Sequence, residues 1–141
     1  MIKPLPDKWI RKAVYDAVNN MVVNTKTIPC FDSRAENVDN YVLLTSQSNE
    51  VLRDNKCEHH WESQILIEVF TTYSISGNPG SRLLADDIAD EIRNRTDVLT
   101  LDVASGLEII DQTQSFPSDL TGTTENANVH RKFIRIELLI N

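Results

Sequence analysis

Glycine is scarce in this chain, and its scarcity excludes most nucleotide-dependent enzymes. The 141 residues include four glycines, which are Gly77, Gly80, Gly106 and Gly122. A dinucleotide-binding fingerprint or a phosphate-binding P-loop needs glycines at short fixed spacing, because its backbone must approach the phosphates closely. Neither motif fits these four positions.

Cysteine and long apolar runs are also lacking, and each absence narrows the class of protein. Two cysteines, Cys30 and Cys57, do not make a disulfide framework, so we predict free thiols in a reducing compartment. No apolar run approaches the ~20 residues of a membrane span. Residues 1–6 have no apolar core of the secretory type. We therefore expect synthesis in a cytosol and no contact with a membrane.

Basic residues are too few for a protein that grips nucleic acid. The chain has 14 basic and 21 acidic residues, which give a formal net charge of −7. Tight binding to nucleic acid relies on a basic surface that neutralises phosphates. An acidic surface keeps a protein soluble, and it also allows nucleic acid to pass without sticking.

Apolar periodicity predicts one α+β domain over residues 1–141. Apolar stripes at helical spacing predict amphipathic helices at 7–22 and 81–95. Further apolar segments predict strands, at 41–46, 61–73, 106–112 and 131–140. Because one helix separates two pairs of strands, the expected fold is a mainly antiparallel sheet of four or slightly more strands, with two helices packed on one face.

Polar segments separate several of these elements. Segment 47–60 is interpreted as a mobile loop or a hairpin arm, and segment 113–129 as a long flexible loop. Segment 24–40 is interpreted as a series of turns, with a short strand near Ile28–Phe31.

One short cluster, Cys57-Glu58-His59-His60, has the residue types of a metal site. Thiolate and imidazole ligands suit zinc, but the spacing is too tight for a zinc finger. Adjacent histidines on a strand also point to opposite sides. We predict no metal, no cofactor and no catalytic residue. A small enzyme that uses Cys57 with His59 or His130 as a nucleophile pair is kept as an alternative.

The strands at 61–73 and 131–140 each have a second face of mixed character. This face combines large apolar side chains with charged ones, whereas a face that only contacts water usually carries fewer large apolar groups. Such a mixture is typical of a subunit interface. The alternative is a face covered by the chain itself, for example by segment 113–129. The predicted interface residues are Leu66, Glu68, Phe70, Phe133, Arg135 and Glu137.

The layout of these segments resembles the tail-completion or tail-terminator family of tailed bacteriophages, which are small α+β proteins of similar length. The segments that carry the resemblance are Trp9–Met21, Tyr41–Leu44, Ile65–Phe70, Leu84–Ala89 and Arg131–Ile136. The resemblance covers most of the chain and concerns its layout. The long polar loops depart from the family's pattern.

The resemblance implies a structural virion protein and not an enzyme. Members form a homo-oligomeric ring, commonly a hexamer, at the head-proximal end of the tail. The ring ends growth of the tail tube and docks to the head-completion or connector protein, and DNA passes through it without specific binding. The implied location is the tail or neck of the virion, after synthesis in the cytoplasm of a bacterial host. A head–tail connector ring and a host-type adaptor module without a virion role are the alternatives.

Overall fold

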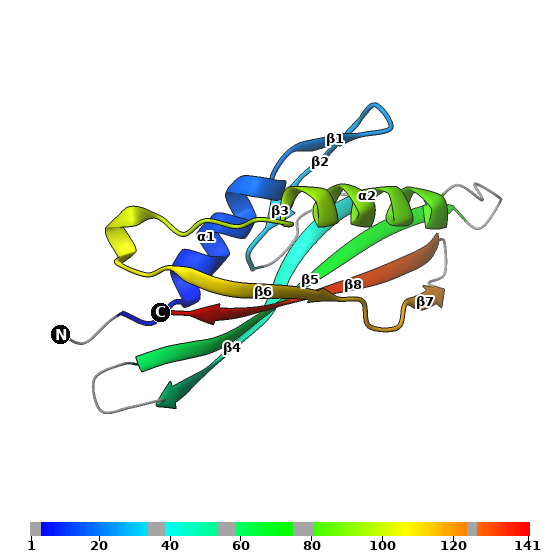
Figure 1. Cartoon of the computed structure of the whole chain (residues 1–141). Coiled ribbons are helices and arrows are strands. Elements are labelled where there is room, and N and C mark those ends of the chain that lie inside the picture. The colour runs from blue at the N-terminus through cyan, green and yellow to red at the C-terminus, as the bar shows by residue number, and fades with distance from the viewer. Residues whose placement is uncertain (1–3, 34–38, 54–58, 75–80, 124–126) are drawn as a thin grey trace.

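Helices and strands make up most of this computed structural model (Figure 1). The structure describes residues 4–33, 39–53, 59–74, 81–123 and 127–141. Its helices are α1 (Asp7–Val18), α2 (Ser81–Arg95) and the short 3-10 helix η1 (Val103–Ser105). Its strands are β1 (Met21–Val23), β2 (Lys26–Ile28), β3 (Cys30–Phe31), β4 (Asn40–Arg53), β5 (His59–Ser74), β6 (Ile109–Ser115), β7 (Leu120–Thr123) and β8 (Ala127–Ile140).

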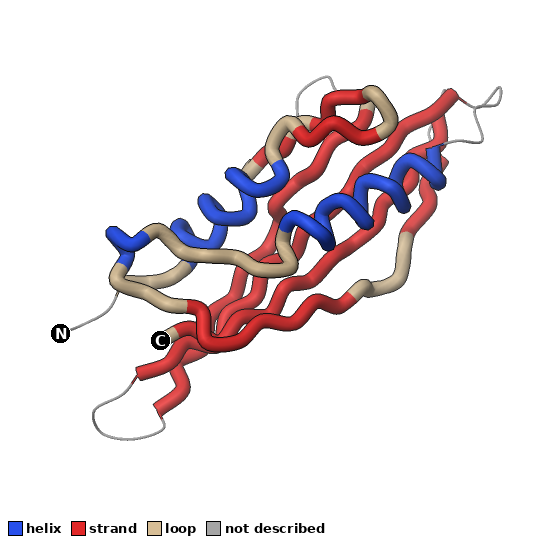
Figure 2. Tube along the Cα trace, turned by 45° about the horizontal axis from the view of Figure 1, so that its top comes forward, coloured by secondary structure: helices blue, strands red, loops and turns tan. Residues whose placement is uncertain are grey.

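The main sheet has the strand order β3-β4-β5-β8-β6, with β7 also paired to β8. All of these pairs are antiparallel except β3 with β4, which is parallel. The strands β1 and β2 form a separate hairpin. Both long helices lie on one face of the sheet (Figure 2), where α1 contacts β4 and α2 contacts β5 and β8. The predicted α+β class, with two helices on one face of a mainly antiparallel sheet, is confirmed.

The hydrophobic core lies between the helices and the sheet. Strand alternation directs one set of β5 and β8 side chains toward the helices, and the apolar stripes of α1 and α2 meet them there. The members of this core that are completely buried include Ile10, Val14, Val18, Ile65, Ile67, Val69, Ile88, Ile92, Ile134, Ile136 and Ile140. The predicted helix-facing side of each long strand is therefore confirmed.

The first helix is shorter than predicted. It ends at Val18, and the chain turns at Asn20, which has a φ of 57°. Asparagine tolerates this left-handed conformation better than most residues do. Met21, which lies within the helix predicted at 7–22, is buried on β1 instead. In the described part of the chain, no helix is both long enough and apolar enough to span a membrane.

The polar segment 47–60 forms the arm of a long hairpin, as one of its two interpretations predicted. Strand β4 pairs with β5 as far as Arg53 with His59, and residues 54–58 lie outside the described part of the chain. The polar side chains here attach the start of α1 to the sheet. Gln47 donates a hydrogen bond of 2.9 Å to the carbonyl of Asp7, and Asn49 donates one to the Asp7 carboxylate.

The prediction of a loop at 113–129 is wrong. Strand β6 continues to Ser115, β7 spans Leu120–Thr123, and β8 already begins at Ala127, whereas residues 124–126 lie outside the described part. The segment lacks apolar residues because its helix-facing side chains form hydrogen bonds instead. Gln114 donates to the hydroxyl of Thr96 at 2.9 Å, just beyond the end of α2. A strand whose polar side chains form such hydrogen bonds therefore resembles a loop in its amino-acid composition.

Candidate functional site

The six predicted interface residues lie together on the face of the main sheet opposite α1 and α2, which we call the outer face. Strand β5 provides Leu66, Glu68 and Phe70, and β8 provides Phe133, Arg135 and Glu137. The register of this antiparallel pair places Glu68 opposite Phe133 and Leu66 opposite Arg135. Their common face is thus an observation, and their role as an interface stays a prediction.

Aromatic rings form a row across one half of the outer face. The rings of Tyr41 and Phe70 stack with their centroids 4.7 Å apart, and Phe31 meets Tyr41 edge-on at 5.9 Å. The row follows the strand order, because Tyr41 on β4 pairs directly with Phe70 on β5. Offset-stacked and edge-to-face rings of this kind hold one another in fixed positions.

A charged pair continues this row onto β8. The Arg131 guanidinium lies 2.5 Å from the Glu68 carboxylate, whose side chain is 8% exposed. The same guanidinium lies over the rings of Phe70 and Phe133, at 5.0 and 5.4 Å from their centroids. The carboxylate is therefore desolvated but paired, and the arginine has both an ionic and a cation–π contact.

The pKa of the neighbouring Tyr41 is raised above its ordinary value. Burial raises the pKa of Tyr41, the negative charge of Glu68 raises it further, and Arg131 opposes the shift. The hydroxyl of Tyr41 is therefore neutral at physiological pH. The residues Phe31, Tyr41, Glu68, Phe70, Arg131 and Phe133 thus form one contiguous patch, in which aromatic rings surround a single arginine.

The other three predicted interface residues lie beside this patch. Leu66 and Arg135 are half-buried and Glu137 is exposed. Leu66 and Arg135 border a shallow hollow of about 130 Å³. The alternative of a self-covered face does not hold for the described part of segment 113–129, because β6 and β7 extend the sheet beside β8.

Sequence reasoning placed Arg131 on the correct face but did not select it, and it did not select Tyr41 or Phe31. Strand alternation predicts which side of its own strand a residue faces. It does not predict which strands are neighbours. Phe31 joins the row only because β3 pairs in parallel with β4, so that Phe31 lies beside Leu43.

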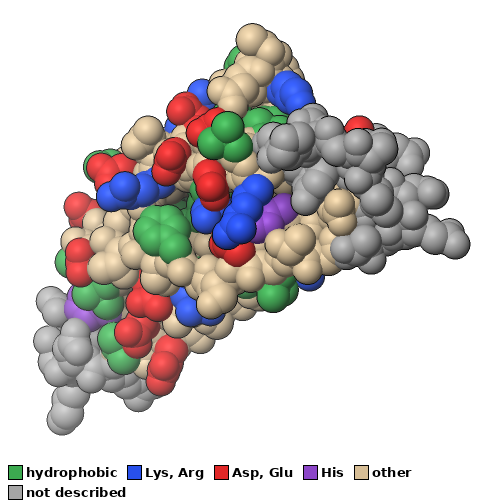
Figure 3. Space-filling model, turned by 90° about the vertical axis from the view of Figure 1, so that its right-hand side faces the viewer, with side chains coloured by type: hydrophobic (Ala, Val, Ile, Leu, Met, Phe, Trp, Pro, Cys, Tyr) green, Lys and Arg blue, Asp and Glu red, His purple; other side chains and the backbone are tan. Residues whose placement is uncertain are grey.

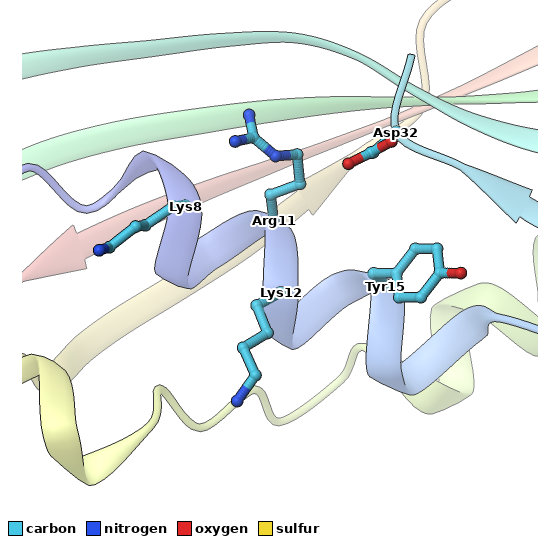
Figure 4. A pocket seen from close by; sticks show the side chains of 5 residues that line it. All are labelled: Lys8, Arg11, Lys12, Tyr15 and Asp32. Carbon is cyan, nitrogen blue, oxygen red and sulfur yellow. The ribbon is translucent and has the colours of Figure 1, made fainter. Parts of the chain in front are cut away.

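A second concave region lies along α1 and has a volume of about 340 Å³. It is lined by Lys8, Arg11, Lys12 and Tyr15 of the helix, and by Asp32. Figure 4 shows the three basic side chains pointing in different directions, so they do not converge on one ligand.

Two of these basic groups already have partners within the chain. Arg11 donates a hydrogen bond of 2.9 Å to Gln47, and Lys12 pairs with Asp102 at 2.9 Å. The hydrogen bond from Lys12 holds the pKa of the Asp102 carboxyl below its usual value. We assign no small-molecule chemistry to this concave region.

The alternative of a cysteine–histidine enzyme depends on a cysteine that the structure does not describe. Cys57 and the side chain of His59 lie outside the described part. Cys30 is a free, buried thiol whose pKa is raised to about 12 by burial, so it is not a reactive thiolate. His130 is buried on the helix side, with Nδ1 2.9 Å from the Thr121 hydroxyl. Among the described residues, no three His, Cys, Asp or Glu side chains are grouped to hold a metal ion.

Comparison with known proteins shows a similarity in fold, but none in sequence family. No protein-family model matches the chain, and no curated protein is significantly similar to it in sequence. Its fold is similar to that of a chain in a solved structure described as "Virion of native gene transfer agent (GTA) particle". The TM-score is 0.60, the match covers 94% of this chain and 96% of that chain, and the sequence identity is 13%.

Proposed function

We propose that this chain is a structural protein of a phage-like virion and acts by assembly with other subunits. The observation that carries this proposal is the similarity in fold to a chain of a gene transfer agent virion, which extends over nearly the whole length of both chains. The layout of the sequence, which resembles that of phage tail-completion proteins, supports the same class independently of the fold.

Within this class, we propose a homo-oligomeric ring at the head-proximal end of the tail. A ring subunit needs two different contact surfaces, because each copy meets the next head-to-tail. The outer face adds a surface for docking to the tail tube or to the head-completion protein. Its aromatic patch with a central arginine has the composition of an energetically dominant interface cluster.

The charge of the chain is compatible with this position. A net charge of −7 disfavours adhesion to DNA, and DNA must pass the junction between head and tail. The proposal thus includes no specific DNA contact, no cofactor and no catalytic step. The location that follows is the tail or neck of the particle. A head–tail connector ring remains the second candidate, because it has the same ring geometry.

Deletion of the gene from a genome that produces the particle tests this proposal, with electron microscopy of the products as the measurement. A tail terminator predicts tail tubes of uncontrolled length that are not joined to heads. A connector predicts tails of normal length beside DNA-filled heads that are not joined to them. Normal, infectious or transducing particles would contradict any virion role. Complementation with the wild-type gene is the control.

A further inference from the structure

Strand β7 borders the aromatic patch of the outer face. Leu120 of β7 pairs directly with Arg131 of β8, on the side of β8 away from Phe70. Phe70 pairs in turn with Tyr41 of β4, so one row of side chains crosses four strands on the same face. Leu120 is a large apolar residue at the end of this row, and it is 51% exposed. The patch therefore extends one strand further than its aromatic rings do.

Backbone pairing alone gives β7 little support in this position. The strand has four residues, and among the described strands it pairs only with β8. A two-stranded hairpin is marginally stable at best in water. Side-chain contacts on the reverse side of β7 therefore decide how firmly it stays on the sheet.

The main contact on the reverse side of β7 is a buried histidine. His130 of β8 lies opposite Thr121 and is 2% exposed. Its Nδ1 atom is 2.9 Å from the Thr121 hydroxyl. Its Nε2 atom is 3.4 Å from the carboxylate of Asp119 and has no hydrogen-bond partner among the described residues. One imidazole ring thus contacts both β7 and the segment that leads into it.

The charged groups around a neutral His130 leave one negative charge uncompensated. In the described part of the chain, the ion pairs here involve Asp119, Asp86 of α2 and Lys132 of β8. Lys132 Nζ lies 3.1 Å from Asp86 and 3.3 Å from Asp119, so two carboxylates share one ammonium group. Strand β5 contributes Thr71, which lies opposite His130 and carries no charge. Figure 3 shows a histidine side chain beside basic and acidic side chains near the middle of the view.

Protonation of His130 would neutralise this cluster. A neutral imidazole has one N–H group, whereas the protonated ring donates from both nitrogen atoms. Both acceptors are in place, because Thr121 lies at Nδ1 and Asp119 at Nε2. Burial and Lys132 oppose the charged ring, and the two carboxylates favour it. Since a hydrogen bond between charged groups is shorter and about twice as strong as a neutral one, closure of the 3.4 Å gap would tighten β7 onto β8.

We propose that His130 is a positioning residue for the outer face, which holds β7 on β8 most firmly when its ring is protonated and so keeps Leu120 beside Arg131. Histidine is the side chain that commonly changes its charge between about pH 5 and 8, so acid strengthens this contact. Leu120 then belongs to the docking surface together with Phe133. The inference rests on the proposed docking role of the outer face, but the contact at His130 can be measured without a partner.

Amide hydrogen exchange of the isolated full-length chain tests the contact at His130. Protection factors, which correct for the intrinsic effect of pH on exchange, are measured for the amides of β7 between pH 5.5 and pH 7.5. We expect protection about tenfold higher at the acid end in the wild type. His130→Gln should give lower protection that does not change with pH. Strand β6, which also lies at an edge beside β8, is the internal control and should show no such rise.

Asp119→Asn gives the same information if His130→Gln does not fold, because the Asp119 side chain is 24% exposed and keeps its shape in this variant. It removes the charge that the protonated ring meets, so protection of β7 should no longer rise in acid. Asp87→Asn is the matched control, since this α2 carboxylate contacts Asn24 outside the cluster, and it should keep the wild-type pH profile. A flat profile in the wild type, or an undiminished rise in His130→Gln or Asp119→Asn, would overturn the positioning role.

Incorporation into purified particles tests the role of Leu120. Leu120→Ala should reduce incorporation about tenfold with little change in Tm, because its side chain is half exposed in the isolated chain. Leu83→Ala is the matched control, since Leu83 is 64% exposed on α2 in the helix layer. Normal incorporation of Leu120→Ala beside a defect in Phe133→Ala would exclude β7 from the docking surface. Normal incorporation of both variants would refute docking on the outer face itself, which the exchange experiment does not depend on.

Discussion

Truncation of Phe133 to alanine should weaken docking on the outer face more than it weakens the fold. Ile67, which serves as the comparison, is completely buried against the helices, and its truncation should cost about 2–5 kcal/mol of folding free energy. Phe133 is only half-buried. Since full burial of a phenylalanine contributes about 1.5–3 kcal/mol, losing half of it and a cation–π contact should cost about 1–2 kcal/mol.

Thermal melts measure the loss of folding free energy in each variant. For a chain of this length, each kcal/mol lowers Tm by about 2–4 °C, so Ile67→Ala should melt roughly 6–15 °C lower and Phe133→Ala roughly 3–6 °C lower. Val22→Ala is the matched control for loss of an apolar side chain, because Val22 is 64% exposed on β1. It should change neither stability nor assembly.

Incorporation of each variant into purified particles measures its loss of binding through the outer face. If Phe133 is an anchor of an interface, its loss should reduce binding by about 30-fold, the effect of removing about 2 kcal/mol at a central contact. Arg135→Glu should act in the same direction, with little change in Tm. The reasoning is refuted if Phe133→Ala melts as low as Ile67→Ala while particles still incorporate it at the wild-type level.

Three further outcomes follow from the structure. Arg131→Ala should destabilise the fold by about 1–3 kcal/mol in denaturant melts, because it leaves the desolvated Glu68 without its partner, and Glu68→Gln in the same background should recover part of this loss; an unchanged midpoint for Arg131→Ala would contradict the assignment. Cys30 should resist iodoacetamide in the native state up to about pH 10, because burial raises its pKa to about 12, and rapid alkylation at pH 8 would contradict its burial. Gln112→Ala should cost about 1–3 kcal/mol, because it removes the bonds to the Thr96 carbonyl and the Leu99 amide; amide exchange in β6 should then accelerate, and unchanged exchange would show that other contacts hold the strand.

Local periodicity was sufficient to predict the helices and the long strands. The buried side of β5 follows from its alternation, and α2 follows from its apolar stripe. A strand was predicted at 106–112, but the continuation of β6 to Ser115 was not, because Gln114 satisfies a helix end with hydrogen bonds in place of apolar packing. Gln112 and Gln114 both donate to groups at the end of α2, and Gln114 lies in the segment that was interpreted as a loop.

The sequence predicted which residues of one strand share a face, but it did not predict which residues of different strands meet in the candidate site. Alternation correctly grouped Glu68 with Phe70, and Phe133 with Arg135. The ion pair of Glu68 with Arg131 and the stack of Tyr41 on Phe70 depend on strand neighbours far apart in the sequence. The deep burial of Cys30 could not be predicted for the same reason, because it follows from the parallel pairing of β3 with β4.

Cryo-electron microscopy of the purified particle tests the central claim most directly, because it shows whether and where the chain is part of the virion. The proposed function predicts density for a closed ring of this fold where the tail meets the head, with each subunit contacting its neighbour head-to-tail. Absence of the chain from particles that are otherwise complete, confirmed by mass spectrometry of the same sample, would contradict a structural role in the virion.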